Sequence, residues 1–81
     1  NAVYVMVNGS HDKERMLKSH RMYYVLDGRG FFEVDGEKQE VSKTDLVVIP
    51  PSSTYYYEGR MKLFEVNFPA TDSSDVEKVT D

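Results

Sequence analysis

The sequence contains no cysteine and no tryptophan, and it has only three prolines and two histidines among its 81 residues. The absence of cysteine excludes disulfides, thiolate metal sites and cysteine nucleophiles, and it is typical of a reducing compartment. No apolar run approaches the roughly 18 residues that a membrane-spanning helix needs. We therefore expect a soluble, cytoplasmic protein without a membrane partner.

Basic residues are in the minority, since fourteen acidic residues outnumber ten lysines and arginines and the net charge is −4. This charge disfavours general attraction to nucleic acid, so we expect no nucleic-acid partner. A chain this short has a small core that a partner subunit often completes, and we expect a homodimer. Residues 71–81 are polar and acidic, and they are expected to form a flexible tail that follows a domain at 1–70.

The strand signals are short runs of period-two hydrophobicity that glycine or polar turns interrupt. They fall at 2–9, 21–41, 45–51, 54–59 and 61–68. Asp-Gly pairs at 27–28 and 35–36 favour tight turns, which divide 21–41 into two successive hairpins. Only 11–19 could carry a helical turn. The pattern predicts an all-β sandwich or barrel of short antiparallel strands.

Two stretches carry a family resemblance. The phrase "VLDGRGFFEVDG" at 25–36 is followed by "DLVVIPP" at 45–51. In this order and at this distance they resemble the central run of the cupin superfamily, and the resemblance covers roughly residues 19–69. It implies a cupin-type jelly-roll β-barrel of short antiparallel strands, with 1–70 as a single domain.

Cupins that hold a metal ion bind it through histidines and a glutamate from two motifs, and none of these ligands stands in register here. Anchored on Gly28, the glutamate position is Arg21, and the first two histidine positions fall within 14–17, which contains no histidine. The histidine position of the second motif is Tyr55. A guanidinium and a neutral phenol cannot replace the imidazole and carboxylate ligands of divalent metals. The resemblance therefore implies a barrel without a metal ion, and we expect no cofactor.

Strand alternation then assigns side chains to the lumen of the barrel. If Tyr55 occupies an inward-facing ligand position, Tyr57 faces inward with it and Tyr56 faces the other side. The same rule applied from Arg21 places Tyr23 inward. The lumen is expected to hold one arginine among three tyrosines.

A buried arginine needs a carboxylate of the protein, an anionic ligand or water at an open mouth. On the last strand, either Glu65 and Asn67 or their apolar neighbours face inward. If Glu65 does, it can pair with Arg21; otherwise the guanidinium is free to bind a carboxylate or phosphate of a ligand. The candidate ligand-binding residues are Arg21, Tyr23, Tyr55, Tyr57 and Glu65.

Each candidate also has a purely structural interpretation. The inward tyrosines can fill the core of a small barrel with their hydroxyls satisfied near its mouth, and the phenylalanines are expected in the core or a dimer contact. His20 points outward unless a bulge turns it inward, and His11 lies in a polar loop where exposure is expected. With Glu14 or Glu33 the two histidines could form an unorthodox metal site, although their spacing matches no strong pattern.

Three functions fit these residues. The first is a binding or sensing barrel for a small polar or anionic molecule, such as a sugar or a carboxylate. The second, which the resemblance implies, is a metal-independent enzyme such as a sugar or sugar-nucleotide isomerase or epimerase, with a lumen tyrosine or a re-aimed His20 moving the proton. A tyrosine is a poor base unless Arg21 lowers its pKa. The third is a structural dimerisation domain with Tyr24, Tyr56 and the phenylalanines in an apolar interface rather than a pocket.

Overall fold

The computed structural model describes residues 1–71 and 73–80. Apart from one 3-10 turn, η1 (Ser73–Asp75), the regular elements of this part are all strands. They are β1 (Ala2–Ser10), β2 (Glu14–Met16), β3 (His20–Val34), β4 (Glu37–Ser42), β5 (Leu46–Ile49), β6 (Thr54–Phe68) and β7 (Val76–Lys78). Every pairing between them is antiparallel. The expected all-β fold is confirmed.

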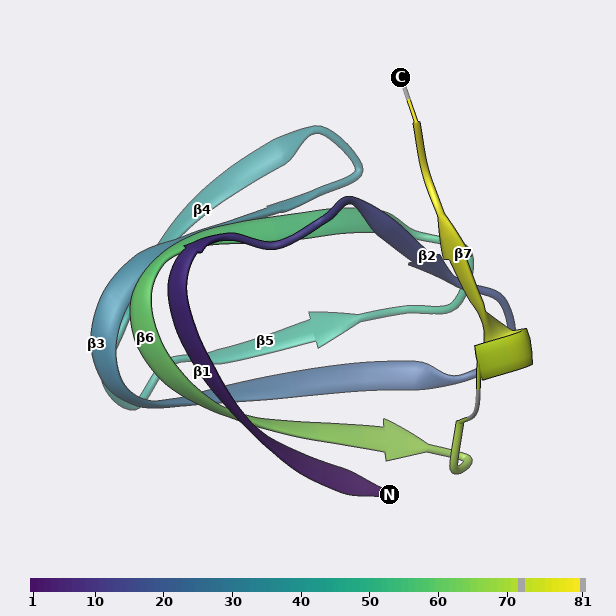
Figure 1. Cartoon of the computed structure of the whole chain (residues 1–81), viewed down its shortest axis with the longest axis horizontal. Coiled ribbons are helices and arrows are strands. Elements are labelled where there is room, and N and C mark those ends of the chain that lie inside the picture. The colour runs from purple at the N-terminus through teal and green to yellow at the C-terminus, as the bar shows by residue number, and fades with distance from the viewer. Residues whose placement is uncertain (72, 81) are drawn as a thin grey trace.

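Two long strands, β3 and β6, form the centre of this fold. β3 and β6 pair along their whole length, from His20 opposite Phe68 to Val34 opposite Tyr55. The other edge of β3 pairs first with β5 and then with β4, while the other edge of β6 pairs with β1 and β2. Figure 1 shows β1, β3 and β6 curling together into a U, so that one continuous ribbon supplies two facing walls of the barrel.

The expected turn at 27–30 is wrong, because β3 runs through it with only an irregularity in register between Val25 and Asp27. The expected turn at Asp35 and Gly36 is confirmed and connects β3 to β4. Similarly, 54–59 and 61–68 form one strand rather than two. Glycines in these strands mark a sharp bend of the ribbon rather than its reversal.

The bend needs glycine because the two strands approach closely there. A methyl group on Gly28 would lie against the Arg60 carbonyl oxygen, and one on Gly59 would lie 2.6 Å from the Arg29 carbonyl oxygen. Gly28 also has a φ of +85°, in the region that disfavours side chains. Both the backbone conformation and the space at this position therefore require glycine.

Gly28→Ala is expected to destabilise the barrel more than Gly36→Ala does. Gly36 has nearly the same φ, +83°, but no atom lies within 4 Å of an added methyl group. Gly36→Ala should lower the free energy of unfolding by about 1 kcal/mol, because a side chain is disfavoured in the left-handed backbone region. Gly28→Ala should lower it by about 2 kcal/mol more, because the added methyl group also meets a backbone carbonyl that cannot move aside. Urea unfolding of both variants measures the difference, and equal losses would contradict the close approach.

The interior is filled by aromatic and aliphatic side chains from both walls. The buried cluster contains Tyr23, Val25, Phe32, Val41, Ile49, Tyr55, Tyr57, Met61 and Leu63. Phe32 lies between two tyrosines, with ring centroids 5.1 Å from Tyr23 and 4.9 Å from Tyr57. The tyrosine rings therefore belong to the core, and the chemistry of the lumen lies at their hydroxyl ends.

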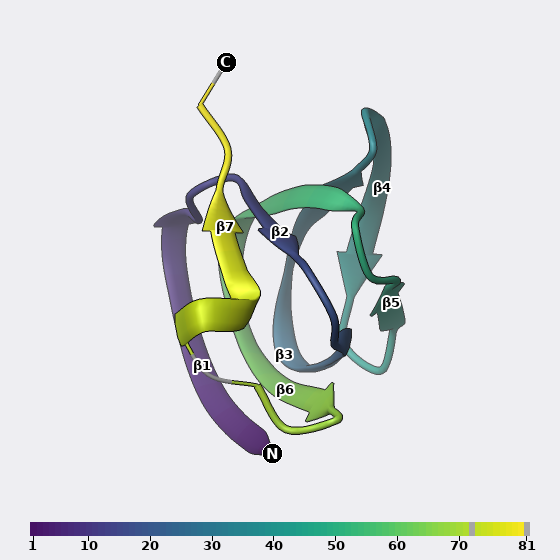
Figure 2. The ribbon, with the colours of Figure 1, turned by 90° about the vertical axis from the view of Figure 1, so that its right-hand side faces the viewer.

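The open end of the U is crossed by elements that the sequence did not predict. Residues 14–16 form strand β2 instead of a helical turn, and β7 pairs with β2 rather than belonging to a flexible tail. Figure 2 shows η1 and β7 in front of this end. Asp75 fixes the segment, because its carboxylate accepts hydrogen bonds from the backbone N–H groups of Lys18 and Ser19 at 2.6 and 3.1 Å. Hydrogen bonds with the Ser19 side chain, and further ones from Thr71 and these N–H groups, lower the pKa of Asp75.

Two further observations concern the outside of the molecule. In β5, Leu46 and Val48 are more than half exposed. In the part of the chain that the structure describes, no helix is long and apolar enough to cross a membrane.

Candidate functional site

Strand β6 orients its three consecutive tyrosines as alternation predicts. Tyr55 and Tyr57 are buried in the lumen, whereas Tyr56 lies on the other side against Phe31, with ring centroids 5.8 Å apart. Tyr23 is also fully buried. The inward placement of these residues is confirmed; their role toward a ligand stays a prediction.

Arg21, Tyr55 and Tyr23 form a chain of hydrogen bonds that we call the polar clasp. Arg21 Nη1 donates to the Tyr55 hydroxyl at 2.7 Å, and the hydroxyls of Tyr55 and Tyr23 are 2.8 Å apart. Arg21 lies near the start of β3 and Tyr55 at the start of β6, where β6 pairs with the other end of β3. The clasp therefore joins the two facing walls of the ribbon through side chains.

Glu65 and Asn67 are the inward set on β6, which resolves the alternative that the sequence left open. Arg21 Nε donates to Asn67 Oδ1 at 2.6 Å, and Asn67 Nδ2 donates to Glu65 Oε2 at 3.0 Å. Arg21 Nη2 is 3.6 Å from Glu65 Oε2, and Nη1 is 3.7 Å from Glu14 Oε1. The protein itself thus surrounds the guanidinium with an amide, a phenol and two carboxylates, and the arginine is not free for an anionic ligand.

Burial determines the protonation of the clasp. Burial on its own lowers the pKa of Arg21, but the oxygens of Tyr55 and Tyr23, and then Glu65, raise it above its ordinary value. Burial also raises the pKa of Tyr23, Tyr55 and Tyr57, and for Tyr55 it outweighs the opposing effect of Arg21. The three tyrosines are therefore neutral phenols near neutral pH, which donate and accept hydrogen bonds but are not bases.

His11 lies at the mouth of the lumen, where the sequence did not place it. Its backbone N–H donates to the Tyr57 carbonyl at 2.8 Å, which holds the residue just beyond the end of β1. The imidazole stacks on the Tyr57 ring at 4.4 Å between centroids, and its Nε2 is 3.6 Å from Glu14 Oε1. Its Nδ1 is buried and has no hydrogen-bond partner among the described residues. The expectation of an exposed loop histidine is wrong.

A hollow adjoins this histidine. It has a volume of about 290 Å³, and its wall includes Val5, Val7, His11 and Tyr57. Volumes of a few hundred cubic ångströms are typical of small-molecule sites. The mouth beside His11 is therefore the place where a ligand can meet both an imidazole and a phenol.

Comparison with known proteins places the fold in a family. Residues 3–66 match the family described as "Cupin domain". The chain belongs to the cupin family. The resemblance expected from the two glycine-rich phrases is therefore confirmed, and most of the matched region is the curled ribbon described above.

Three relatives are informative for this cupin. An uncharacterized protein of Methanocaldococcus jannaschii is 35% identical over 73% of this chain and 50% of its own length, so the chain spans about half of that curated relative. Streptomyces Pac13, a nucleoside dehydratase, is 30% identical with a TM-score of 0.94, over 98% of this chain and 67% of Pac13. KdgF from a Halomonas species is 22% identical with a TM-score of 0.82, over 90% and 71% of the two chains, and supports the fold alone.

Pac13 has also been studied as variants with uridine. In one variant a histidine is replaced by glutamine, and in two others a tyrosine is replaced by phenylalanine. The TM-scores of these structures against this cupin are 0.94 to 0.96.

The metal-binding residues that many cupins carry are not matched by the donors of this lumen. Arg21, which is always positively charged, lies between the two walls of the barrel. The nearest oxygens in the lumen belong to a phenol and to carboxylates that already contact Arg21. Within 1–71 and 73–80, no group of three histidine, aspartate or glutamate residues could hold a metal ion. His20 stacks on Phe68 with ring centroids 5.5 Å apart, so the unorthodox site with His11 is not formed. The donor set does not fit a divalent metal.

Proposed function

We propose that this cupin binds a small, neutral, hydroxyl-rich molecule of the nucleoside class at the mouth of its barrel, without a metal ion, and that His11 moves a proton in a dehydration reaction. The observation that carries the proposal is the stacked His11, whose Nε2 faces a carboxylate while its Nδ1 has no partner.

The enzyme considered in the sequence analysis had no histidine paired with a carboxylate. His11 and Glu14 form such a pair. Glu14 lies beside Nε2 and orients the imidazole from one side. The other nitrogen, Nδ1, is buried without a partner among the described residues, so in this proposal the substrate contacts it from the adjoining hollow, where it takes a proton from a substrate carbon and returns it to the departing hydroxyl group. Elimination of water needs both transfers, and one imidazole can carry them out in succession.

The tyrosines suit binding and orientation rather than proton removal. Their raised pKa values keep them as phenols, which can donate and accept hydrogen bonds toward a ligand. The imidazole of His11 stacks on the buried Tyr57 ring and borders the hollow, so its other face is a surface against which a sugar or a base can lie. Aromatic walls with a few polar groups are typical of sites for such ligands.

The comparison with Pac13 supports the nucleoside class. The residue types substituted in the Pac13 variants with uridine, one histidine and two tyrosines, are those that meet at this mouth. The two substituted tyrosines are as far apart in their sequence as Tyr23 and Tyr57 are here. The histidine precedes the first of them by one residue more than His11 precedes Tyr23.

The charges of the site favour a neutral ligand over an anionic one. One guanidinium, that of Arg21, lies within 4 Å of two carboxylates, Glu14 and Glu65. A phosphate at this mouth would therefore approach excess negative charge, since Arg21 already contacts both carboxylates. The expectation of an anionic ligand depended on a free Arg21 and is not supported by these contacts. The expectation of a polar ligand does not depend on Arg21 and remains.

Uridine is expected to bind roughly tenfold more tightly than uridine monophosphate, because the phosphate meets the uncompensated carboxylate. Isothermal titration calorimetry at low salt measures both affinities. Glu14→Gln should reduce the difference in affinity between uridine and uridine monophosphate. Glu77→Gln, which removes an exposed carboxylate outside the site, should leave this difference unchanged. Tighter binding of the nucleotide would mean that Arg21 is available to anions, and a failure of uridine to bind would refute the nucleoside class.

A second candidate is a binding or sensing module that catalyses no reaction. It is favoured by the clasp, because the hydroxyls of Tyr23 and Tyr55 are already engaged with each other and with Arg21. Uridine binding without turnover of any carbonyl-bearing nucleoside would select this function.

A further inference from the structure

One outer surface of the barrel is apolar where a solvated sheet would be polar. Outward positions of β1, β6, β3 and β5 form two cross-strand rows, since Tyr4 pairs with Phe64, Phe64 with Tyr24, and Tyr24 with Leu46. We call these rows the apolar face. It consists of Ala2, Tyr4, Met22, Tyr24, Leu46, Val48, Phe64 and Val66.

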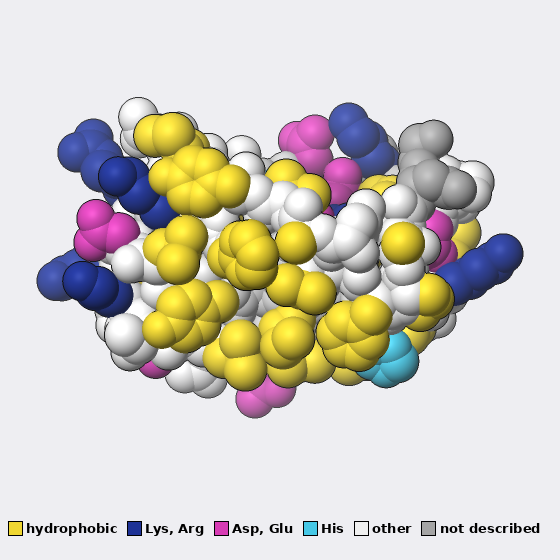
Figure 3. All heavy atoms as spheres, turned by 90° about the horizontal axis from the view of Figure 1, so that it is seen from below, with side chains coloured by type: hydrophobic (Ala, Val, Ile, Leu, Met, Phe, Trp, Pro, Cys, Tyr) yellow, Lys and Arg dark blue, Asp and Glu magenta, His cyan; other side chains and the backbone are white. Residues whose placement is uncertain are grey.

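The apolar face contains no charged residue, although the same strands carry charges elsewhere. Beyond the bend, outward positions of β3 and β6 hold Arg29, Glu58 and Arg60, all exposed. An antiparallel sheet with one face in water normally alternates apolar and polar residues throughout. The change of character within single strands separates a solvated wall from one that is suited to contact. Figure 3 shows the hydrophobic side chains gathered on this side.

The face is large enough for a stable interface. Tyr4, Leu46 and Val48 are 54%, 58% and 51% exposed. With the flanking Met6, Leu26 and Phe68, the exposed area of these apolar residues is on the order of 800 Å², which is what each partner buries in a standard-sized interface. It also exceeds the roughly 300–600 Å² of the largest patch on a typical monomer.

We propose that the apolar face binds the same face of a second copy of this chain, forming a two-fold symmetric dimer in which the two sheets pack against each other. A face without charges can meet itself without like-charge repulsion, which is what a two-fold contact requires. The chain as a whole carries a net charge of −4, so contacts through its charged walls are less favourable.

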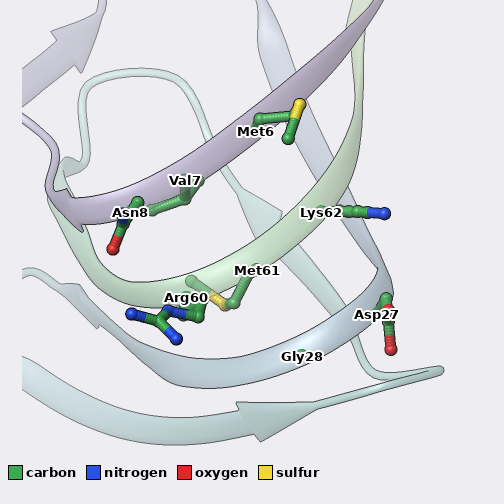
Figure 4. Close-up of a pocket in the computed structure, with 8 residues that line it drawn as sticks. All are labelled: Met6, Val7, Asn8, Asp27, Gly28, Arg60, Met61 and Lys62. Atoms are coloured by element: carbon green, nitrogen blue, oxygen red, sulfur yellow. The ribbon is translucent and has the colours of Figure 1, made fainter.

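The border of the face has the polar character of an interface rim. Lys62 lies opposite Met6 on β1 and Asp27 on β3, so opposite charges are adjacent at this edge. A hollow of about 390 Å³ lies at the same place, with Met6, Asp27, Arg60 and Lys62 around it (Figure 4). An apolar centre with a charged rim and a pocket beside it is the usual anatomy of a specific interface.

Sedimentation equilibrium at micromolar concentration is expected to give twice the chain mass for the wild type. Phe64→Asp should weaken the dimer on the order of 100-fold or more, because the symmetry buries two new charges at the centre of one interface. Leu17→Asp is the matched control: Leu17 and Phe64 are both 42% exposed, but Leu17 lies outside the face, so this variant should remain dimeric.

Circular dichroism tests whether both variants are folded. If Phe64→Asp is unfolded, Leu46→Glu provides a second substitution on the apolar face. A monomeric wild type would overturn the proposal. Dimers of unchanged affinity in both face variants would overturn it as well.

Discussion

His11→Gln should lower turnover by a factor of about 10² to 10⁴, which is the usual contribution of a positioned acid–base group. Glutamine keeps a planar polar side chain beside Tyr57, but it cannot exchange a proton. Uridine affinity should change only a few-fold, because the wall that binds the ligand is preserved. The assay is loss of water from a nucleoside that carries a carbonyl group, detected by mass spectrometry, since a carbonyl acidifies the neighbouring C–H bond.

The other histidine of the chain is the control. His20 lies at the start of β3 and stacks on the exposed Phe68, away from the lumen tyrosines. His20→Gln should retain wild-type turnover. If His11→Gln retains turnover as well, the proton is moved by another group, and the proposed role of His11 is refuted.

Arg21→Met should destabilise the barrel by about 3–5 kcal/mol, the range found when one partner of a buried charged network is removed. Arg21 is 6% exposed, and the loss of its guanidinium leaves Glu65, Asn67 and the Tyr55 hydroxyl without their shared partner. If Arg21 instead served only a ligand, its replacement would barely change stability. Urea unfolding without ligand separates these cases.

Arg15→Met is the matched arginine variant. Arg15 pairs with Glu77 at 2.8 Å, but both side chains are substantially exposed, and the loss should be about 1 kcal/mol or less. In a Glu65→Gln background, the loss caused by Arg21→Met should shrink, because one carboxylate fewer is left without its guanidinium partner. Equal, small losses for the two arginines would show that the clasp does not stabilise the fold.

The sequence predicted the class of fold and the inward set on β3 and β6 because both depend on local alternation. Period two places Tyr55 and Tyr57 on one side and Tyr56 on the other, whatever the strand pairs with. The error at 27–30 has the opposite origin. Asp-Gly favours a turn locally, but the close approach of Gly28 to the Arg60 backbone is a contact between distant segments, which no local rule contains.

The missing part of the site was non-local in the same way. His11 and Glu14 are three residues apart, a spacing that signals little by itself. They become a pair at the mouth because β1 and β2 both pair with β6, at Ser10 opposite Glu58 and Glu14 opposite Tyr55. The acidic composition of 71–81 suggested a tail, whereas the Asp75 carboxylate satisfies backbone groups that the sequence could not identify.

β3 and β6 are in effect the two arms of one long hairpin, whose loop contains β4 and β5. Once the arms have met at Val34 and Tyr55, each further pair toward His20 and Phe68 closes almost no additional loop. The bond between Arg21 and Tyr55 requires that this ribbon has curled on itself, so we expect it to be a late contact in folding. Late contacts slow unfolding without speeding folding, and we therefore expect the lifetime of the closed barrel to depend on the hydrogen bonds that also shape its mouth.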